Sequence, residues 1–451
     1  MMLSTLLDYS MNPNLSELSV LRIFSWPLLF ALALSCSRNE NSIDTNERIK
    51  LQDTCNKNSN HSYELYIPSN AKDCSQLPLL VILDPHGHGK SAIENFIPAA
   101  ERYKCMLVAS NLVKNNFPDY QTEIDILIKD VRIKYPSNNI VYIAGFSGGA
   151  RMALSFAQYH DVDGIIACGA LVSANQIESI NTTVFTLTGM QDFNFIETAQ
   201  YFFRSENTPE NLRIELTDEM HEWPSEHELS NSIAYLILAE NTKKIKCLDI
   251  GKTREQFGDS QKSRIDTLKK AGNYLSASLI AQNMIHLNDG ESANQFQSIR
   301  NSLVYSEELN DELGRLRESI RFELTVRDTY LKALLSEDYA WWINEISSLN
   351  KKIRQDTDHY RNLAYKRIKA FLGIMCYTLT NKALQSGDTK STGRLLSVYA
   401  LVEPDNPDMF FFYAVYSKQT GRTEEVKIFL QKAIDAGFSD QLLLEKISTF
   451  N

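Results

Sequence analysis

The sequence predicts an α/β domain with a mostly parallel sheet, followed by an all-α domain. Between residues 61 and 241, short apolar runs alternate with segments that carry apolar residues at helical spacing. Several runs are apolar throughout, as expected for parallel strands covered on both faces. After residue 242 strand-like runs nearly vanish, while helical periodicity continues. Alternating strands and helices are typical of a layered α/β domain, and the second half has only helices to pack.

The composition limits the size of the protein and the class of its partner. The 451 residues are 43% hydrophobic and carry a formal net charge of −10. A chain of this length accommodates two or three domains. Binding to nucleic-acid phosphates needs a concentrated basic surface, so we expect no nucleic-acid partner.

An apolar run near the N-terminus resembles an export signal. Residues 23–35, IFSWPLLFALALS, are followed directly by Cys36. The run is shorter than the roughly 20 residues that cross a bilayer, and it fits the apolar part of a signal. The letters LALSC resemble the lipobox of bacterial lipoproteins. This resemblance implies a signal over 1–35, lipidation of Cys36, and a lipid-anchored protein at the periplasmic or outer-membrane face of the cell envelope. Plain secretion and a cytosolic location are the alternatives.

A polar tether is expected over residues 36–60, before the α/β domain at 61–241. Export would permit disulfides, and Cys55 and Cys74 flank the first predicted strand. Small buried or free thiols are the favoured interpretation of both cysteines.

The strands and helices of the α/β domain follow from these patterns. Strands are predicted at 63–67, 77–84, 105–110, 139–146, 164–171, 183–189 and 212–216. Helices are predicted at about 91–103, 121–134, 148–159, 195–203 and 226–240.

The second domain, 242–451, is predicted to consist of helical hairpins. Apolar residues recur at helical spacing over 261–286, 292–324, 326–350 and 354–386. Gly387 and Gly421 mark turns that are 34 residues apart, which is the tetratricopeptide period. We therefore expect a tetratricopeptide-like region. The aromatic residues at 410–413 and 341–342 are interpreted as packing between helices.

The segment VYIAGFSGGARMAL contains the strongest functional signal. It predicts a strand, a glycine-rich turn at 145–149 and a helix, with Ser147 at the centre of Gly-x-Ser-x-Gly. Such a turn exposes a nucleophilic serine above a sheet. Together with TGMQDFN and HEWP, which follow in that order, GFSGG resembles the α/β-hydrolase superfamily, in particular its dienelactone-hydrolase and esterase branch. The resemblance covers about residues 61–241 and implies an α/β-hydrolase sandwich.

The resemblance implies a base and an acid for Ser147, in the chain order serine, acid, histidine. His221 lies in the loop after the strand LRIEL, where the base is expected. His227 falls in the first turn of the next helix, behind a predicted capping box of Ser225 and Glu228, and His160 comes too early.

The expected acid is Asp192, which follows the strand TVFTLTG. Its carboxylate could hold the ring N–H of the histidine. Asp161 and Asp163, one strand earlier, are the alternatives, and an ordinary turn-forming aspartate is the structural interpretation of Asp192.

Two backbone N–H groups should stabilise the developing oxyanion. One is expected from Gly148, and the other from the loop LDPHGHGKS, where His88 is the first choice and Gly87 the second. An alternative makes Asp84, His86 and His88 metal ligands, although no further ligand motif accompanies them.

These residues predict a serine hydrolase that cleaves a small-molecule or polymer ester through an acyl-enzyme, without a metal or organic cofactor. A serine peptidase of the same fold is one alternative. Another is a catalytically decayed hydrolase that binds a protein partner through its helical domain, as tetratricopeptide stacks often do. The helical domain could also mediate self-association.

Overall fold

The computed structural model describes residues 48–69, 77–135, 137–203, 208–239, 248–287 and 290–448. The predicted signal, Cys36 and Cys74 lie outside these residues, as does the expected domain boundary near residue 241.

The described strands form one eight-stranded sheet in the order β1-β2-β4-β3-β5-β6-β7-β8. The pairs β3–β4, β3–β5 and β7–β8 are parallel, whereas β1–β2 and β2–β4 are antiparallel. The strands are β1 (Ile49–Cys55), β2 (Asn58–Ile67), β3 (Leu77–Leu83), β4 (Met106–Ser110), β5 (Ser137–Phe146), β6 (Gly164–Cys168), β7 (Val184–Gly189) and β8 (Leu212–Thr217). The prediction of an α/β-hydrolase-like, mostly parallel sheet followed by helices is confirmed.

The predicted tether over 36–60 is too long, because β1 and the start of β2 belong to the sheet. Strand β1 lies at the edge of the sheet, and all its residues before Cys55 alternate between half-buried and exposed. An edge strand with one solvated face has polar residues at every second position, which masks it in a search for apolar runs. Cys55 is a buried free cysteine.

The chain divides into two compact units. The first contains the described residues up to Ile166 together with Leu229–Gly251, and the second contains Ala167–Glu228 and the chain from Lys252 onward. Strands β7 and β8 therefore group with the helices of the second half of the chain, and not with β1–β5.

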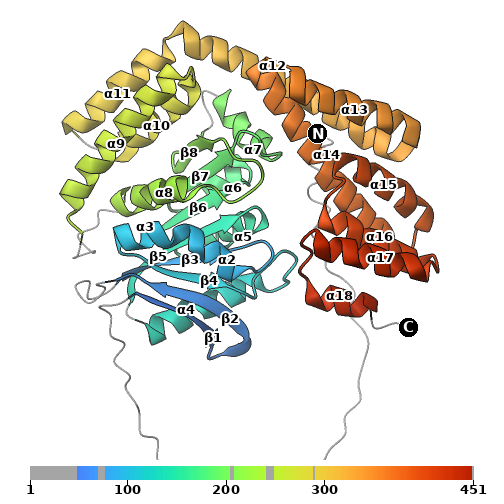
Figure 1. Ribbon diagram of the computed structural model, residues 1–451. Coiled ribbons are helices and arrows are strands. Elements are labelled where there is room, and N and C mark those ends of the chain that lie inside the picture. Colours follow the sequence, from blue (N-terminus) through green and yellow to red (C-terminus); the bar gives the residue numbers. More distant parts are fainter. Residues whose placement is uncertain are drawn as a thin grey trace, which may run out of the picture. The chain divides into compact units, whose positions relative to one another are not determined.

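In the first unit, helices cover both faces of the strands. Helix α3 (Ile97–Tyr103) lies on one face and α4 (Tyr120–Lys134) on the other (Figure 1). Every residue of β3 and β4 is buried, as expected for central parallel strands. The remaining helical elements of this unit are α2 (Gly89–Ala92), η3 (Ile93–Phe96), α5 (Gly148–Ala157) and α8 (Glu226–Ala239, which begins in the second unit).

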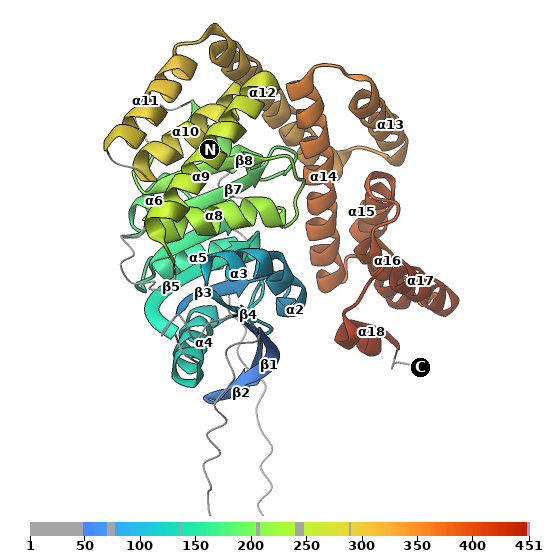
Figure 2. The ribbon, with the colours of Figure 1, turned by 60° about the vertical axis from the view of Figure 1, so that its left-hand side comes forward.

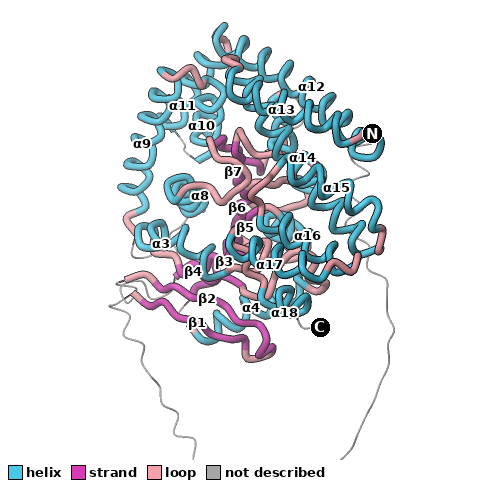
Figure 3. Tube along the Cα trace, turned by 45° about the vertical axis from the view of Figure 1, so that its right-hand side comes forward, coloured by secondary structure: helices cyan, strands magenta, loops and turns pink. Residues whose placement is uncertain are grey.

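The regular elements of the second unit outside the sheet are helices, and Figure 3 shows its later helices in cyan. Before β8 it holds α6 (Ala174–Glu178), α7 (Phe195–Ala199) and η4 (Gln200–Phe202). The later helices are α9 (Ile250–Lys270), α10 (Tyr274–Leu287), α11 (Gly290–Val304), α12 (Glu307–Ser336), α13 (Tyr339–Gln355), α14 (His359–Ser386), α15 (Thr389–Val402), α16 (Pro407–Gln419), α17 (Thr423–Asp435) and α18 (Gln441–Ser448).

Helices α9 and α10 cover the edge strand β8. The side-chain amide of Asn283 donates to the Ile214 carbonyl oxygen at 2.9 Å, and Arg264 Nη2 lies 2.6 Å from Glu215 Oε1. An exposed strand edge invites pairing with another chain, and these contacts occupy it. Figure 2 shows α12 and α14, which pack against each other further along the chain.

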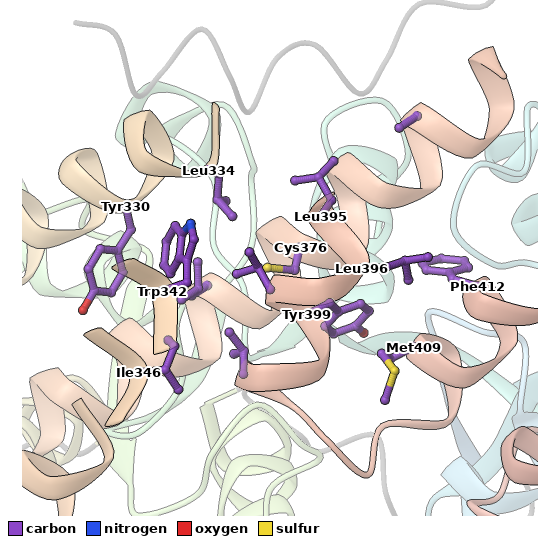
Figure 4. Packing of buried hydrophobic residues seen from close by; sticks show 14 of the residues in the cluster. Tyr330, Leu334, Trp342, Ile346, Cys376, Leu395, Leu396, Tyr399, Met409 and Phe412 are labelled. Carbon is purple, nitrogen blue, oxygen red and sulfur yellow. The ribbon is translucent and has the colours of Figure 1, made fainter. Parts of the chain in front are cut away.

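The core of the later helices confirms the interpretation of the aromatic residues. Trp342 and Phe412 are buried among apolar side chains of the later helices (Figure 4). Phe411 is buried in the same cluster. Gly387 and Gly421 have φ of 72° and 73°, the left-handed conformation that ends helices. The structure therefore has turns at both predicted glycines. The tetratricopeptide-like arrangement of these helices stays a prediction. Among the described helices, none combines the length and apolarity needed to cross a membrane.

Candidate active site

Ser147 sits on a strained turn between β5 and α5. Its backbone has φ 51° and ψ −115°, a region that a residue with a side chain rarely occupies. A Cβ at Gly145 would clash with the Gly149 carbonyl group, so the turn is closed too tightly for other residues. The first backbone N–H groups of α5, including that of Gly148, have no partner within the helix. This turn has the backbone geometry expected of a nucleophile elbow.

The loop that follows β3 lies beside this turn, because β3 and β5 are parallel neighbours with Leu83 opposite Gly145. The buried Asp84 carboxylate accepts the backbone N–H groups of His86 at 2.9 Å and of His88 at 3.1 Å. The N–H of Gly87 donates to the Asp84 carbonyl oxygen at 3.1 Å. The two predicted oxyanion donors of this loop, His88 and Gly87, are thus hydrogen-bonded inside their own loop.

Asn115 is a residue that sequence reasoning missed. Its backbone N–H donates to the Pro85 carbonyl oxygen at 2.8 Å, which ties the loop after β4 to the loop after β3. Its carboxamide lies directly against Gly148, where a Cβ would overlap Asn115 Oδ1. The side chain is exposed and belongs to the same unit as Ser147. Asn115 stands in the polar run KNNF, which gave no motif, so only the folded chain places it at the elbow.

In the second unit, the structure brings Asp192 and His221 together. Asp192 follows β7 and His221 follows β8, and these strands are parallel neighbours. His221 Nδ1 lies 2.9 Å from both carboxylate oxygens of Asp192. Because both oxygens are acceptors, Nδ1 must carry the proton, and a neutral ring then has its lone pair on Nε2. Asp192 is 1% exposed, while the His221 side chain is 21% exposed.

The surroundings of this pair fix its orientation. Asp192 Oδ1 also accepts the Asn194 backbone N–H at 2.7 Å. Asp192 therefore forms a turn and contacts the histidine at the same time. The Phe193 ring packs on the His221 ring with centroids 4.3 Å apart. Backbone hydrogen bonds from Met190 to Thr217 and from Gln191 to Glu219 join the two loops. The carboxylate is buried and multiply bonded, whereas the imidazole keeps an accessible edge.

The alternative candidates for the acid and the base lie in different surroundings in the structure. Asp163 precedes β6 and accepts the Val141 backbone N–H at 2.7 Å, a position at the amino end of a strand. Asp161 precedes the same strand and is exposed. The His160 ring stacks on Phe156 at 4.0 Å.

His227 is exposed in the first turn of α8. The capping box predicted beside it is only half formed. Ser225 Oγ accepts the Glu228 N–H at 3.4 Å, but the Ser225 N–H donates to Glu219.

No cluster of three or more histidine, cysteine or acidic side chains that could hold a metal ion occurs among the described residues. Asp84, His86 and His88, the metal alternative of the sequence, are instead linked by the backbone bonds to the Asp84 carboxylate.

The fold and these residues define an α/β-hydrolase-like protein with a serine elbow and a histidine–carboxylate pair. No family model and no curated protein matches the chain. Solved structures with a similar fold include a dienelactone hydrolase assigned in Klebsiella pneumoniae (15% identity, 43% of this chain and 98% of the other, TM-score 0.35). Others are an α/β serine hydrolase without a lid from Xanthomonas campestris (15%, 42% and 94%, 0.32) and the esterase LipW of Mycobacterium marinum (11%, 42% and 82%, 0.35).

Proposed function

We propose that this protein is a serine hydrolase that cleaves carboxylic esters with Ser147, His221 and Asp192. The observation that carries the proposal is the contact of His221 Nδ1 with Asp192 at 2.9 Å, in which a buried carboxylate orients a partly exposed imidazole. The strained elbow at Ser147 supports it, as does the chain order of serine, acid and histidine. Each of the three residues follows the carboxyl end of a strand, where α/β proteins place their ligands.

In the proposed reaction, Ser147 Oγ attacks the acyl carbonyl carbon while His221 Nε2 takes the hydroxyl proton. Asp192 stabilises the imidazolium that forms. The imidazolium returns the proton to the leaving alcohol as the ester bond breaks, which leaves an acyl-enzyme. Water, deprotonated by His221, then releases the acid and restores Ser147. These steps need no metal or organic cofactor.

The Gly148 N–H, at the N-terminus of α5, is proposed as the first oxyanion donor. The predicted second donor, the His88 N–H, already binds the Asp84 carboxylate. We therefore propose the Asn115 carboxamide for this role, because it lies against Gly148. Asn115 Nδ2 would face the oxyanion after a flip of the carboxamide, since its two ends have the same shape.

A fluorophosphonate probe, which reacts with activated serines, tests this proposal. We expect labelling of the wild type and of His227→Ala, and none of Ser147→Ala or His221→Ala. Hydrolysis of p-nitrophenyl acetate with no cleavage of acyl-p-nitroanilides would favour an ester over a peptide substrate. A folded wild type that is not labelled would contradict the proposal, and a binding protein would then be the better interpretation.

The proposed location is the bacterial cell envelope, with Cys36 lipidated. The support is the LALSC sequence alone. Incorporation of radiolabelled palmitate into the wild type but not into Cys36→Ser is the expected result, and equal incorporation would contradict it.

A further inference from the structure

Two buried arginines from the later helices hold the loop that carries Asp192. Arg367 of α14 donates from Nη1 to the Met190 carbonyl oxygen at 2.6 Å. Arg327 of α12 donates from Nη2 to the Phe193 carbonyl oxygen at 2.8 Å. Both carbonyls flank Asp192, so side chains from another part of the sequence hold the loop on either side of the carboxylate.

Glu323 joins the two arginines into one cluster. Its Oε1 lies 2.5 Å from Arg327 Nη2, and its Oε2 lies 2.8 Å from Arg367 Nε. The side chains of Glu323 and Arg367 are fully buried, and that of Arg327 is 6% exposed. Planar guanidinium groups suit this arrangement, because each can bind a carboxylate and a carbonyl at the same time.

The net positive charge of the cluster can be balanced by the negative charge of Asp192. Two arginines and one glutamate leave a single positive charge in a buried place, which is costly unless a negative charge lies nearby. Asp192 is the buried carboxylate of the held loop. Burial lowers the pKa of Arg327, and Glu323 and Asp192 act in the opposite direction and favour its charged form. With Asp192 included, the four groups carry no net charge.

The loop held by the arginines also contacts the ring of His221. The Phe193 ring packs on the His221 ring, and the Arg367 guanidinium lies over the Phe195 ring, 4.6 Å from its centroid. Phe193, whose carbonyl oxygen accepts from Arg327, therefore also packs on the proposed base. A shift of the Phe193 backbone would move the surface against which the imidazole rests.

Stability alone does not call for such a cluster, since apolar residues of similar volume are often at least as stabilising as a buried ion pair. Apolar residues supply neither hydrogen bonds aimed at two carbonyls nor a positive charge. We propose that Arg327 and Arg367, joined by Glu323, are positioning residues that hold Asp192 and His221 in the orientation needed for catalysis. The catalytic meaning of this inference rests on the proposed function. The later helices would then be part of the catalytic machinery, and a chain ending near residue 241 would lack the cluster.

Two variants and a matched control test the inference in the full chain. Arg327→Met removes the bond to Phe193 and leaves Glu323 and Arg367 balanced. The double variant Glu323→Leu/Arg367→Met removes a balanced ion pair together with the bond to Met190, and should keep the stability of the wild type. Arg264→Met is the control, because it breaks an arginine–glutamate pair between α9 and β8, away from the Asp192 loop.

For both test variants we expect kcat on p-nitrophenyl acetate and the rate of fluorophosphonate labelling to fall about 100-fold, as small displacements of catalytic groups do. KM should stay near the wild-type value. Arg327→Lys, which keeps the charge and a single donor nitrogen, should recover part of the loss. Arg264→Met should match the wild type per folded molecule. If the double variant, folded by its melting curve, reacts as fast as Arg264→Met, the inference is wrong.

A second readout does not depend on activity. The His221 Nδ1 proton, held between two carboxylate oxygens, should give a downfield proton resonance that is absent from His221→Gln. We expect this resonance to shift or disappear in both test variants and to persist in Arg264→Met. An unlabelled wild type would remove the proposed function, and the resonance would still decide the positioning role. An unchanged resonance in both folded test variants would overturn that role.

Discussion

The first unit contains a serine–histidine–carboxylate series of its own, in which the bond between histidine and carboxylate resembles that of His221 with Asp192. His61 Nδ1 lies 2.8 Å from Glu123 Oε2, and its Nε2 lies 2.8 Å from Ser110 Oγ. His221 likewise directs Nδ1 to a carboxylate. By residue type and distance alone, both histidines are candidates for a catalytic base.

Burial and backbone geometry separate the two. His61 and Ser110 are fully buried, whereas the His221 side chain is 21% exposed. Ser110 Oγ also accepts the backbone N–H groups of Leu112 and Val113, at 3.2 and 2.9 Å, and so closes the end of β4. Of the two serines, Ser147 alone has a positive φ, as an elbow requires. A hydrogen-bonded serine, histidine and carboxylate therefore do not by themselves indicate an active site. Solvent access to the histidine and a strained backbone at the serine are the better indicators.

Replacing each histidine by alanine should give the largest contrast. His221→Ala should lower the rate of probe labelling on the order of 10⁴–10⁶-fold, because Ser147 would lose its proposed base. His61→Ala should leave the rate per folded molecule near wild type. It should lower the free energy of unfolding by about 2–4 kcal/mol, through a cavity and unpaired buried groups. Labelling kinetics and urea unfolding measure the two effects, and loss of labelling in folded His61→Ala would remove the distinction.

The carboxylates should differ in the same direction. Asp192→Asn should lower kcat on the order of 10⁴-fold, since an amide does not stabilise the imidazolium or enforce the tautomer. Glu123→Gln should affect stability by about 1–3 kcal/mol and leave kcat unchanged. Steady-state kinetics on p-nitrophenyl acetate, with protein concentration corrected for the folded fraction, tests both. Equal losses of kcat would show that the two pairs are not functionally distinct.

Asn115 provides a further test of the comparison, because its carboxamide lies against Gly148, the residue after Ser147. Asn115→Ala should lower kcat about 10²–10³-fold if the carboxamide stabilises the oxyanion. Its side chain is exposed, so the melting temperature should not change. Lys114→Ala, at the exposed neighbouring position, is the control. A wild-type kcat in Asn115→Ala would contradict this role, and a backbone N–H would again be the better candidate for the second oxyanion donor.

How much of this could be predicted from the sequence depends on the range of each interaction. The central strands and the turn at Ser147 follow from local patterns, because apolar runs and a Gly-x-Ser-x-Gly turn act over a few residues. The pairing of Asp192 with His221 was inferred through a family resemblance, and the structure places the two in contact.

The remaining features depend on long-range packing. Arg327 and Arg367 resemble surface charges on helices until the fold buries them against the Asp192 loop. The hydrogen bond from the His88 N–H to Asp84 depends on the conformation of the loop, which the sequence alone does not reveal. The grouping of β7 and β8 with the later helices arises from contacts far apart in the sequence.

The smallest predicted effect is on the pH dependence of stability. Burial lowers the pKa of His61 from its ordinary value of 6.5, and Glu123 and Asp130 oppose this only in part. Between that value and the lower folded pKa, the unfolded chain binds a proton that the folded chain does not. The contribution of neutral His61 to stability is therefore complete above pH 6.5 and declines as the pH falls below it.

Urea unfolding of the wild type and of His61→Gln at pH 7.5 and 5.5 measures this contribution as the difference between the two proteins. His286, whose pKa is also lowered by burial, is present in both and cancels. The free energy of unfolding of the wild type should fall more on acidification than that of His61→Gln. The same fall in both proteins would mean that His61 is protonated in the fold. The distinction between the two histidines would then rest on access and on the backbone geometry of the neighbouring serine.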